Sequence, residues 1–354
     1  MPYLLGIEIG DSTVTAAMCR PPHVRPADAG AMGAWGPPQP VALGVSGPVI
    51  ASTLLLAPGG DLVAADGGAA HAADQAYGFV HRVGDDVPVL LADHPFPAQV
   101  LMAGMAGWVI GRLWQLQGQA PESIAVAHPT GWGPYRLDLL RAAFDQAGLG
   151  EPALVSRAGA VVTSFQSAGR LPAGGTMLLV FRLGGSSLEI SLVNLHTTGL
   201  FELITSVEST DINGSDLNAA DAAAQRAILR AGVDLAARTV QACGIHAENL
   251  AGVLLAGAAA GYAQLTDLLT VDFPVTILRD DDPRMTVACG AALSVRPRTP
   301  RVPAVPAPIG QTAMVAMSSL DEEPLAESIS PGPQAVLPPP RPPVRVTAAP
   351  AGRR

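Results

Sequence analysis

Residues 7–14 read Ile-Glu-Ile-Gly-Asp-Ser-Thr-Val, and residues 181–188 repeat this pattern as Phe-Arg-Leu-Gly-Gly-Ser-Ser-Leu. Each copy contains an apolar strand with a charged residue near its end, a glycine turn with small or hydroxyl residues, and a second strand. Glycine permits the positive φ angles and the close approach by which such a turn directs N–H groups and hydroxyls at an anion. The repeat predicts two similar lobes that present these turns to each other. The alternative is a pair of ordinary glycine hairpins.

Strands and helices alternate around both copies of the pattern. Apolar runs bounded by turn residues predict strands, and apolar groups three and four residues apart predict helices. The predicted strands lie at 3–10, 13–18, 123–128, 176–183, 187–195, 201–207 and 252–257, with further strands on both sides of a turn at Gly59-Gly60. The predicted helices lie at 97–117, 134–148, 218–242, 261–270 and from Pro283 onward. Hairpins mixed with strand-to-helix crossovers indicate an α/β fold.

The chain contains no lysine, since all 21 of its basic residues are arginine. This absence excludes a Walker-type phosphate loop, which places a lysine on the phosphates, and pyridoxal phosphate enzymes, which form a lysine Schiff base. The net charge of −9 argues against nucleic-acid binding, which requires a basic face. We therefore expect neither of these enzyme classes and no nucleic-acid partner.

Residues 297–354 differ sharply in composition from the rest of the chain. Fourteen of these 58 residues are proline, and residues 338–343 read PPPRPP. Proline lacks a backbone N–H and the stretch offers few large apolar groups, so it cannot form a packed core. We expect a folded domain at residues 1–296 and a disordered proline-rich tail at 297–354. The tail is either a solvated linker or a docking segment for a protein partner.

Signals for membranes, secretion and metals are missing from the sequence. No apolar run reaches the roughly 18 residues that span a bilayer, and the start lacks the basic region and cleavage site of a signal peptide. Cys19, Cys243 and Cys289 show no pairing or metal spacing, and the seven histidines show none either. Residues 280–282 are all aspartate and precede Pro283, where acidic groups favour the helix dipole; cation coordination is the alternative. We expect a cytoplasmic location, no membrane span and no metal centre.

The order of these segments resembles the actin-like ATPase fold, and most closely the seventy-kilodalton heat-shock (DnaK-type) chaperone family. The resemblance covers residues 3–295. The segments at 5–18 and 176–193 resemble the family's two phosphate hairpins. The other similar segments are the strand–helix unit at 123–149, the connecting helix at 155–165, the adenosine motif at 253–265 and the closing helix at 281–295.

This resemblance implies two ribonuclease-H-like lobes with a central cleft. Lobe I would comprise residues 1–172 and 283–296, and lobe II residues 173–282. Only 34 positions separate Asn218 from the strand at 252, where the family has a whole helical subdomain. The second lobe is therefore expected to be reduced.

The resemblance also implies a nucleotide site for ATP or ADP between the two hairpins and the adenosine motif. The adenosine motif is eroded, because alanines replace a glycine and the hydroxyl residues, and Gly261 replaces an arginine. The implied nucleotide-binding residues are Gly10, Asp11, Ser12, Thr13, Gly184, Gly185, Ser186, Ser187, Gly257 and Ala258.

The family's catalytic positions are replaced in this sequence. The family uses two aspartates, a glutamate and a lysine around magnesium-bound phosphates. Here Glu8 stands at the first aspartate, Arg182 at the second and Arg157 at the glutamate, while His81 or Arg82 lies in the segment of the lysine. Two arginines beside a divalent cation would repel it. Magnesium-dependent hydrolysis by the family's route is therefore not expected.

The two arginines allow two interpretations. Arg182 and Arg157 either clamp a phosphate directly, as guanidinium groups do well, or Arg182 pairs with Glu8 across the cleft. We favour the pairing, because the adenine pocket is also eroded. The leading functional hypothesis is a degenerate DnaK-like protein with weak ATP or ADP binding and little or no hydrolysis. The alternative is a pseudoenzyme scaffold that recruits protein partners through its fold and tail, similar to divergent family members that accompany secretion machinery.

Overall fold

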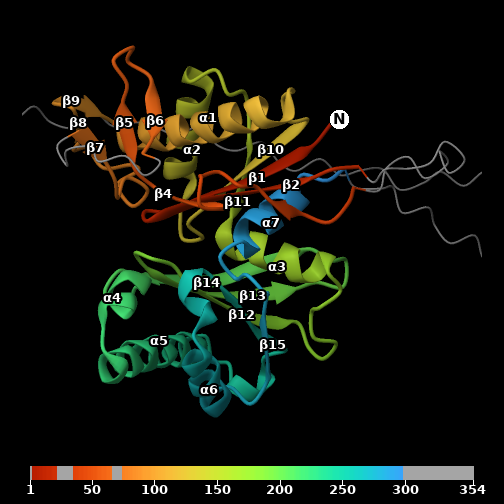
Figure 1. Cartoon of the computed structure of the whole chain (residues 1–354). Coiled ribbons are helices and arrows are strands. Elements are labelled where there is room, and N and C mark those ends of the chain that lie inside the picture. The colour runs from red at the N-terminus through yellow and green to blue at the C-terminus, as the bar shows by residue number, and fades with distance from the viewer. Residues whose placement is uncertain (1, 22–34, 66–73, 298–354) are drawn as a thin grey trace, which may run out of the picture. The chain divides into compact units, whose positions relative to one another are not determined.

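Two mixed β-sheets form the framework of the structure, a computed structural model in which residues 2–21, 35–65 and 74–297 are described (Figure 1). The chain therefore has the mixed α/β architecture that the sequence predicts. Residues 1–300 form one structural unit. The predicted proline-rich tail lies, from residue 298 onward, outside the described residues.

The first sheet combines the first hairpin with two parallel strands. Its order is β11-β10-β1-β2-β3, and β4 also pairs with β2. β1 and β2 are antiparallel, whereas β10 runs parallel to β1 and β11 runs parallel to β10. The strands are β1 (Leu4–Ile9), β2 (Thr13–Cys19), β3 (Gln39–Pro40), β4 (Val49–Ala51), β10 (Ser123–His128) and β11 (Ala153–Ser156).

The second sheet repeats this topology with the order β14-β13-β12-β15-β16. β12 and β13 are antiparallel, while β15 and β16 follow in parallel on the other side of β12. The strands are β12 (Met177–Leu183), β13 (Leu188–Leu195), β14 (Phe201–Ser209), β15 (Gly252–Ala256) and β16 (Thr276–Arg279). The repeated sequence pattern thus occupies the same place in both sheets, namely the turn of the central hairpin.

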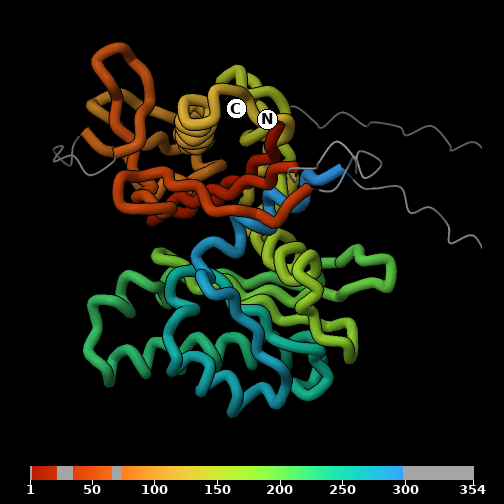
Figure 2. Tube along the Cα trace, turned by 45° about the vertical axis from the view of Figure 1, so that its right-hand side comes forward, coloured from red at the N-terminus to blue at the C-terminus, as the bar shows by residue number. Residues whose placement is uncertain are grey.

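Helices α3 (Arg157–Ser167) and α7 (Thr286–Ser294) lie between the two sheets in both views (Figures 1 and 2). α3 follows β11 and packs on β10 and β11 of the first sheet as well as on β12 and β15 of the second, whereas α7 follows β16 but packs on β1, β2 and β10. The two helices approach at their backbones, because a Cβ atom on Gly290 would lie 1.7 Å from the carbonyl oxygen of Ala160. The two helices therefore form a layer between the sheets (Figure 1).

Two further helices, α1 (Ala98–Gln117) and α2 (Pro134–Gln146), complete the core of the first sheet. Pro134 occupies the first helical turn, where its missing N–H needs no partner. Short strands extend this part of the chain, and the predicted turn at Gly59-Gly60 is confirmed between two of them. These strands are β5 (Leu54–Leu56), β6 (Leu62–Ala64), β7 (Gln75–Ala76), β8 (Val89–Leu91) and β9 (His94–Phe96).

Helices α5 (Ala222–Ala242) and α6 (Ala263–Asp272) pack on the second sheet. The single helix predicted from residue 218 is wrong at its start, because α4 (Gly214–Ala219) ends before Ala220, which is extended. The carboxylate of Asp221 then accepts a hydrogen bond of 2.9 Å from the N–H of Ala224. Aspartate is a strong N-cap, so this residue begins a new helix.

The C-terminal elements begin later than their sequence pattern indicates. The predicted helix at 261–270 starts at Ala263, after the 3₁₀ helix η4 (Ala258–Gly261), and α7 starts at Thr286. β16 was not predicted, because it is only four residues long and follows Pro274, so its apolar run is too short to indicate a strand. Within the described ranges, no helix is both long enough and apolar enough to cross a membrane.

Candidate functional site

The turns of the two central hairpins touch each other. The hydroxyl groups of Ser12 and Ser186 are in contact, and a Cβ atom on Gly185 would lie 2.7 Å from the hydroxyl oxygen of Ser12. Each turn is closed by an equivalent 2.9 Å hydrogen bond, from Gly10 N–H to the Thr13 carbonyl and from Gly184 N–H to the Ser187 carbonyl. The prediction that the two copies of the pattern face each other is therefore confirmed.

Glu8 and Arg182 form a buried ion pair just beneath these turns. Both residues are 6% exposed. Nε of Arg182 donates to Oε1 of Glu8 over 3.0 Å, and Nη2 contacts the same oxygen. The pairing expected from their equivalent places in the two hairpins is present.

Arg157, the first residue of α3, is the most deeply buried cation of the site, at 1% exposure. Its Nη2 donates to the carbonyl of Ile9 over 3.2 Å, and Nη1 lies 3.7 Å from the carboxylate of Glu189. Its Nε lies 4.0 Å from Oε1 of Glu8 and has no hydrogen-bond partner among the described residues. The guanidinium group is thus neutralised but incompletely hydrogen-bonded.

Glu189 on β13 is a member of the site that sequence reasoning missed. It lies directly opposite Arg182 in the hairpin and is 2% exposed. Its carboxylate accepts hydrogen bonds from the hydroxyl and the N–H of Thr130, and that hydroxyl accepts one from Ala158 N–H over 2.9 Å. An acidic residue within the apolar run at 188–195 was the available signal. Two glutamates and two arginines therefore balance in charge.

Asp11 anchors the edge of the site through His81. Its Oδ1 accepts N–H hydrogen bonds from Val80 and His81, at 2.9 and 3.2 Å, and its Oδ2 lies 2.9 Å from His81 Nε2. The same nitrogen lies 3.7 Å from Glu208 on β14, whose carboxylate also accepts a hydrogen bond from the Ser187 hydroxyl. His81 therefore stands between a carboxylate of the first hairpin and one of the second sheet.

These contacts shift the titration of the groups involved. The contact with Asp11 raises the pKa of His81, although burial opposes it. Burial works to raise the pKa of Asp11, but its bonds to His81 and the charge of that side chain lower it overall. Burial lowers the pKa of Arg157, and the nearby charge of Arg182 adds to this effect. Burial also works to lower the pKa of Arg182. The charge of Glu8 outweighs this effect, so the pKa of Arg182 is raised overall.

Very little free space remains between the two turns. The cavity there has a volume of about 10 Å³, which is room for about one water molecule. A phosphate group therefore requires the turns to separate. Among the described residues, no group of three histidine, cysteine, aspartate or glutamate side chains is placed to hold a metal ion.

The structure brings eight of the ten predicted nucleotide-binding residues together around this space. Gly257 lies behind the second turn, where a Cβ atom would meet the Leu183 carbonyl at 2.4 Å, and Ala258 is exposed at the start of η4. Of the two residues proposed for the lysine segment, His81 reaches the site, whereas Arg82 donates to the carbonyl of Val87. The eight residues are Gly10, Asp11, Ser12, Thr13, Gly184, Gly185, Ser186 and Ser187.

In comparisons with known proteins, no family model matches the chain and no curated protein is significantly similar to it. The resemblance to the DnaK-type family therefore stays a prediction from the motifs of the sequence.

Proposed function

We propose that the chain is a pseudoenzyme of actin-like, DnaK-type fold that serves as a scaffold, with an ionic network where family members hold a nucleotide. The topology supports this fold, because both sheets combine an antiparallel hairpin with two parallel strands, and α3 and α7 form a layer between the sheets. The observation that carries the proposal is the buried ion pair between Glu8 and Arg182.

The network closes the site without a ligand. In phosphoryl-transfer proteins, metal ions bridge the phosphate oxygens and neutralise their charge. Here the carboxylate of Glu8 neutralises Arg182 directly, and the space that remains holds about one water molecule. The residues at the catalytic positions do not fit a bound magnesium ion, because the two guanidinium groups would repel it. A body closed in this way is suited to presenting surfaces to protein partners.

Titration calorimetry of the full chain tests this proposal. ATP and ADP are added separately, each with and without Mg²⁺, and phosphate release is measured in parallel. We expect no saturable heat and no turnover. Saturable binding of either nucleotide to the unmodified chain would contradict the scaffold, and magnesium-dependent turnover would show an enzyme.

A second candidate is a weak, metal-free nucleotide site, and Arg157 is the observation that favours it. A buried cation with an unpartnered Nε provides unused hydrogen-bonding capacity for an anion. If the turns separate, Arg157 and Arg182 together form a phosphate clamp. ATP or ADP binding that does not depend on Mg²⁺ would support this candidate.

The substitution Glu8→Gln separates the two candidates further. It removes the carboxylate that competes with a phosphate for Arg182 and leaves a side chain of similar size. A phosphate clamp predicts that Glu8→Gln binds ATP more tightly than the unmodified chain, and that adding Arg157→Gln abolishes this binding. The scaffold predicts no binding in either variant.

A further inference from the structure

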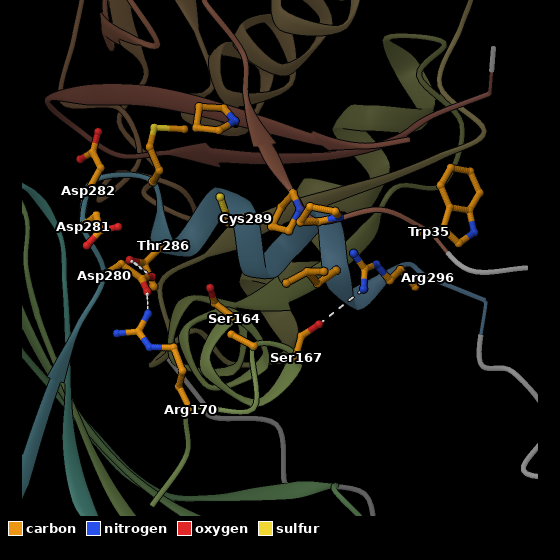
Figure 3. Close-up of a pocket in the computed structure, with 16 residues that line it drawn as sticks. Trp35, Ser164, Ser167, Arg170, Asp280, Asp281, Asp282, Thr286, Cys289 and Arg296 are labelled. Atoms are coloured by element: carbon orange, nitrogen blue, oxygen red, sulfur yellow. Dashed lines mark hydrogen bonds and ion pairs between the residues drawn. The ribbon is translucent and has the colours of Figure 1, made fainter. Parts of the chain in front are cut away.

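A groove on the side of α7 lies apart from the hairpin turns. Its volume is about 690 Å³, within the usual range of ligand pockets. Helices α7 and α3 and the segment before β3 enclose it (Figure 3). Figure 3 shows three aspartates at the start of α7 and Trp35 with Arg296 near its end. The groove therefore follows the helix and has an acidic end and an aromatic end.

The wall of the groove at residues 35–40 is apolar and offers few hydrogen-bond donors, whereas Ser164 and Ser167 line the α3 side (Figure 3). Three prolines line one wall, and proline has no backbone N–H. A partner therefore cannot extend the first sheet along this wall by main-chain hydrogen bonds, because such a strand needs donors. The apolar contacts are supplied by Trp35, Pro37, Pro38, Pro40, Met285 and Leu293.

Most charged groups of the groove are already paired. Asp280 accepts hydrogen bonds from Arg170 and from the hydroxyl of Thr286, and Asp282 is paired with Arg284 over 2.8 Å. Asp281 is exposed and has no ion pair or hydrogen bond with any described residue. Its carboxylate is the negative charge of the groove that remains open to a partner.

We infer that this groove binds an extended, proline-rich segment of another protein, with an arginine at the acidic end. A polyproline II segment needs no main-chain ladder, loses little entropy on binding and packs its rings on aromatic and apolar side chains. The nine residues of α7 span about 13 Å at 1.5 Å per residue, which about four residues of such a segment match at 3.1 Å each. The arginine pairs with Asp281 and the prolines pack toward Trp35.

Fluorescence polarisation with the full chain tests this inference. The probes are two labelled peptides, APPAPR and APPAPE, which differ only in the charge of the last residue. We expect APPAPR to bind about fivefold more tightly, the strength of a partly exposed ion pair. The substitution Asp281→Arg should reverse this preference. Asp86→Arg, at an exposed aspartate outside the groove, is the matched control and should leave it unchanged.

Trp35→Ala provides the second arm of the experiment. It should weaken binding of both peptides; because Trp35 also packs against a buried cluster that includes Leu4 and Leu293, binding is measured at a temperature at which the variant is shown to be folded. Absence of binding by either peptide, or equal binding to the Asp281→Arg and Asp86→Arg chains, would overturn the inference. This readout is independent of the nucleotide titration, so failure of the groove and failure of the scaffold are distinguishable.

Discussion

Arg157 and Arg182 share a single carboxylate oxygen, Oε1 of Glu8. Nε of Arg182 lies 3.0 Å from this oxygen and Nε of Arg157 lies 4.0 Å from it, and all three side chains are buried. The two guanidinium groups repel each other, so the carboxylate between them stabilises both. The stability of the site therefore depends on Glu8 and also on Glu189, whose carboxylate lies 3.7 Å from Arg157.

Removing one member of the ion pair should destabilise the protein strongly. Arg182→Ala leaves the carboxylate of Glu8 buried with fewer partners, which costs about 3–5 kcal/mol for a buried pair. The free energy of unfolding from urea denaturation measures this loss. A loss below about 1 kcal/mol, the range of exposed pairs, would show that the two residues do not hold the hairpins together.

The double substitution Glu8→Leu with Arg182→Met is the matched control for this prediction. It replaces both charges by apolar groups of similar size, and Arg157 loses Glu8 but keeps the carboxylate of Glu189 at 3.7 Å. Replacing a buried ion pair by apolar residues in this way often costs little or no stability. We therefore expect the double variant to be more stable than Arg182→Ala alone.

Thr130 connects Glu189 to the start of α3. Thr130→Val keeps the shape of the side chain but removes the hydroxyl that donates to Glu189 and accepts from Ala158 N–H. Leaving buried polar groups unpaired costs about 1–3 kcal/mol. Thr130→Ser retains the hydroxyl, so its free energy of unfolding should decrease less than that of Thr130→Val. Equal losses for the two variants in urea denaturation would contradict this role of the hydroxyl.

The stabilisation that His81 contributes should decrease as the pH rises above its unfolded pKa of about 6.5. The contact with Asp11 raises the pKa of His81, so its contribution is complete below the unfolded pKa of about 6.5 and is lost as the pH rises through the folded pKa. His128 acts in the opposite direction, because burial lowers its pKa. The prediction therefore concerns the difference between the unmodified chain and His81→Gln.

Melting temperatures between pH 6 and pH 9 measure this difference. The advantage of the unmodified chain over His81→Gln should be largest at pH 6 and should shrink as the pH rises. His94→Gln, at an exposed histidine, is the matched control and should show no such trend. An advantage that is constant across the range would mean that the charge of His81 does not act on Asp11 and Glu208.

The crossing of α3 and α7 should tolerate no side chain at Gly290. Gly290→Ala places a Cβ atom 1.7 Å from the Ala160 carbonyl, so the two helices must move apart. Overpacking of this kind costs about 1–3 kcal/mol or more. Gly111→Ala in α1 is the matched control, because nothing lies within 4 Å of its Cβ position, and it should be neutral or stabilising by up to about 1 kcal/mol. Thermal unfolding of both variants measures the contrast.

The sequence predicted the mixed α/β class and the central hairpins because their signals are local. Apolar strands bounded by glycine turns define β1, β2, β12 and β13, and the repeat indicated that their turns face each other. It also indicated the pairing of Glu8 with Arg182 from their equivalent positions. These predictions needed no knowledge of how distant segments pack.

Other parts of the structure depend on long-range packing, and the sequence could not predict them. Glu189 joins the site because β13 pairs with β12, and Thr130 meets it from a different sheet. The break between α4 and α5 was missed because a run of alanines continues the helical pattern there. Asp221, a residue type that favours the N-cap, was the signal in the sequence for this break. The groove beside α7 combines residues from three separate segments and has no local signal.

The contacts between the two central hairpins join equivalent residues of the two halves of the chain. Glu8 and Arg182 are 174 positions apart, as are Ser12 and Ser186, so each residue meets its own counterpart in the other half. Contacts of this kind lie on an approximate two-fold axis. In a symmetric dimer of identical halves, such a position would bring glutamate against glutamate or arginine against arginine. The buried pair therefore requires two different halves, and their fusion in one polypeptide keeps a carboxylate and a guanidinium group facing each other.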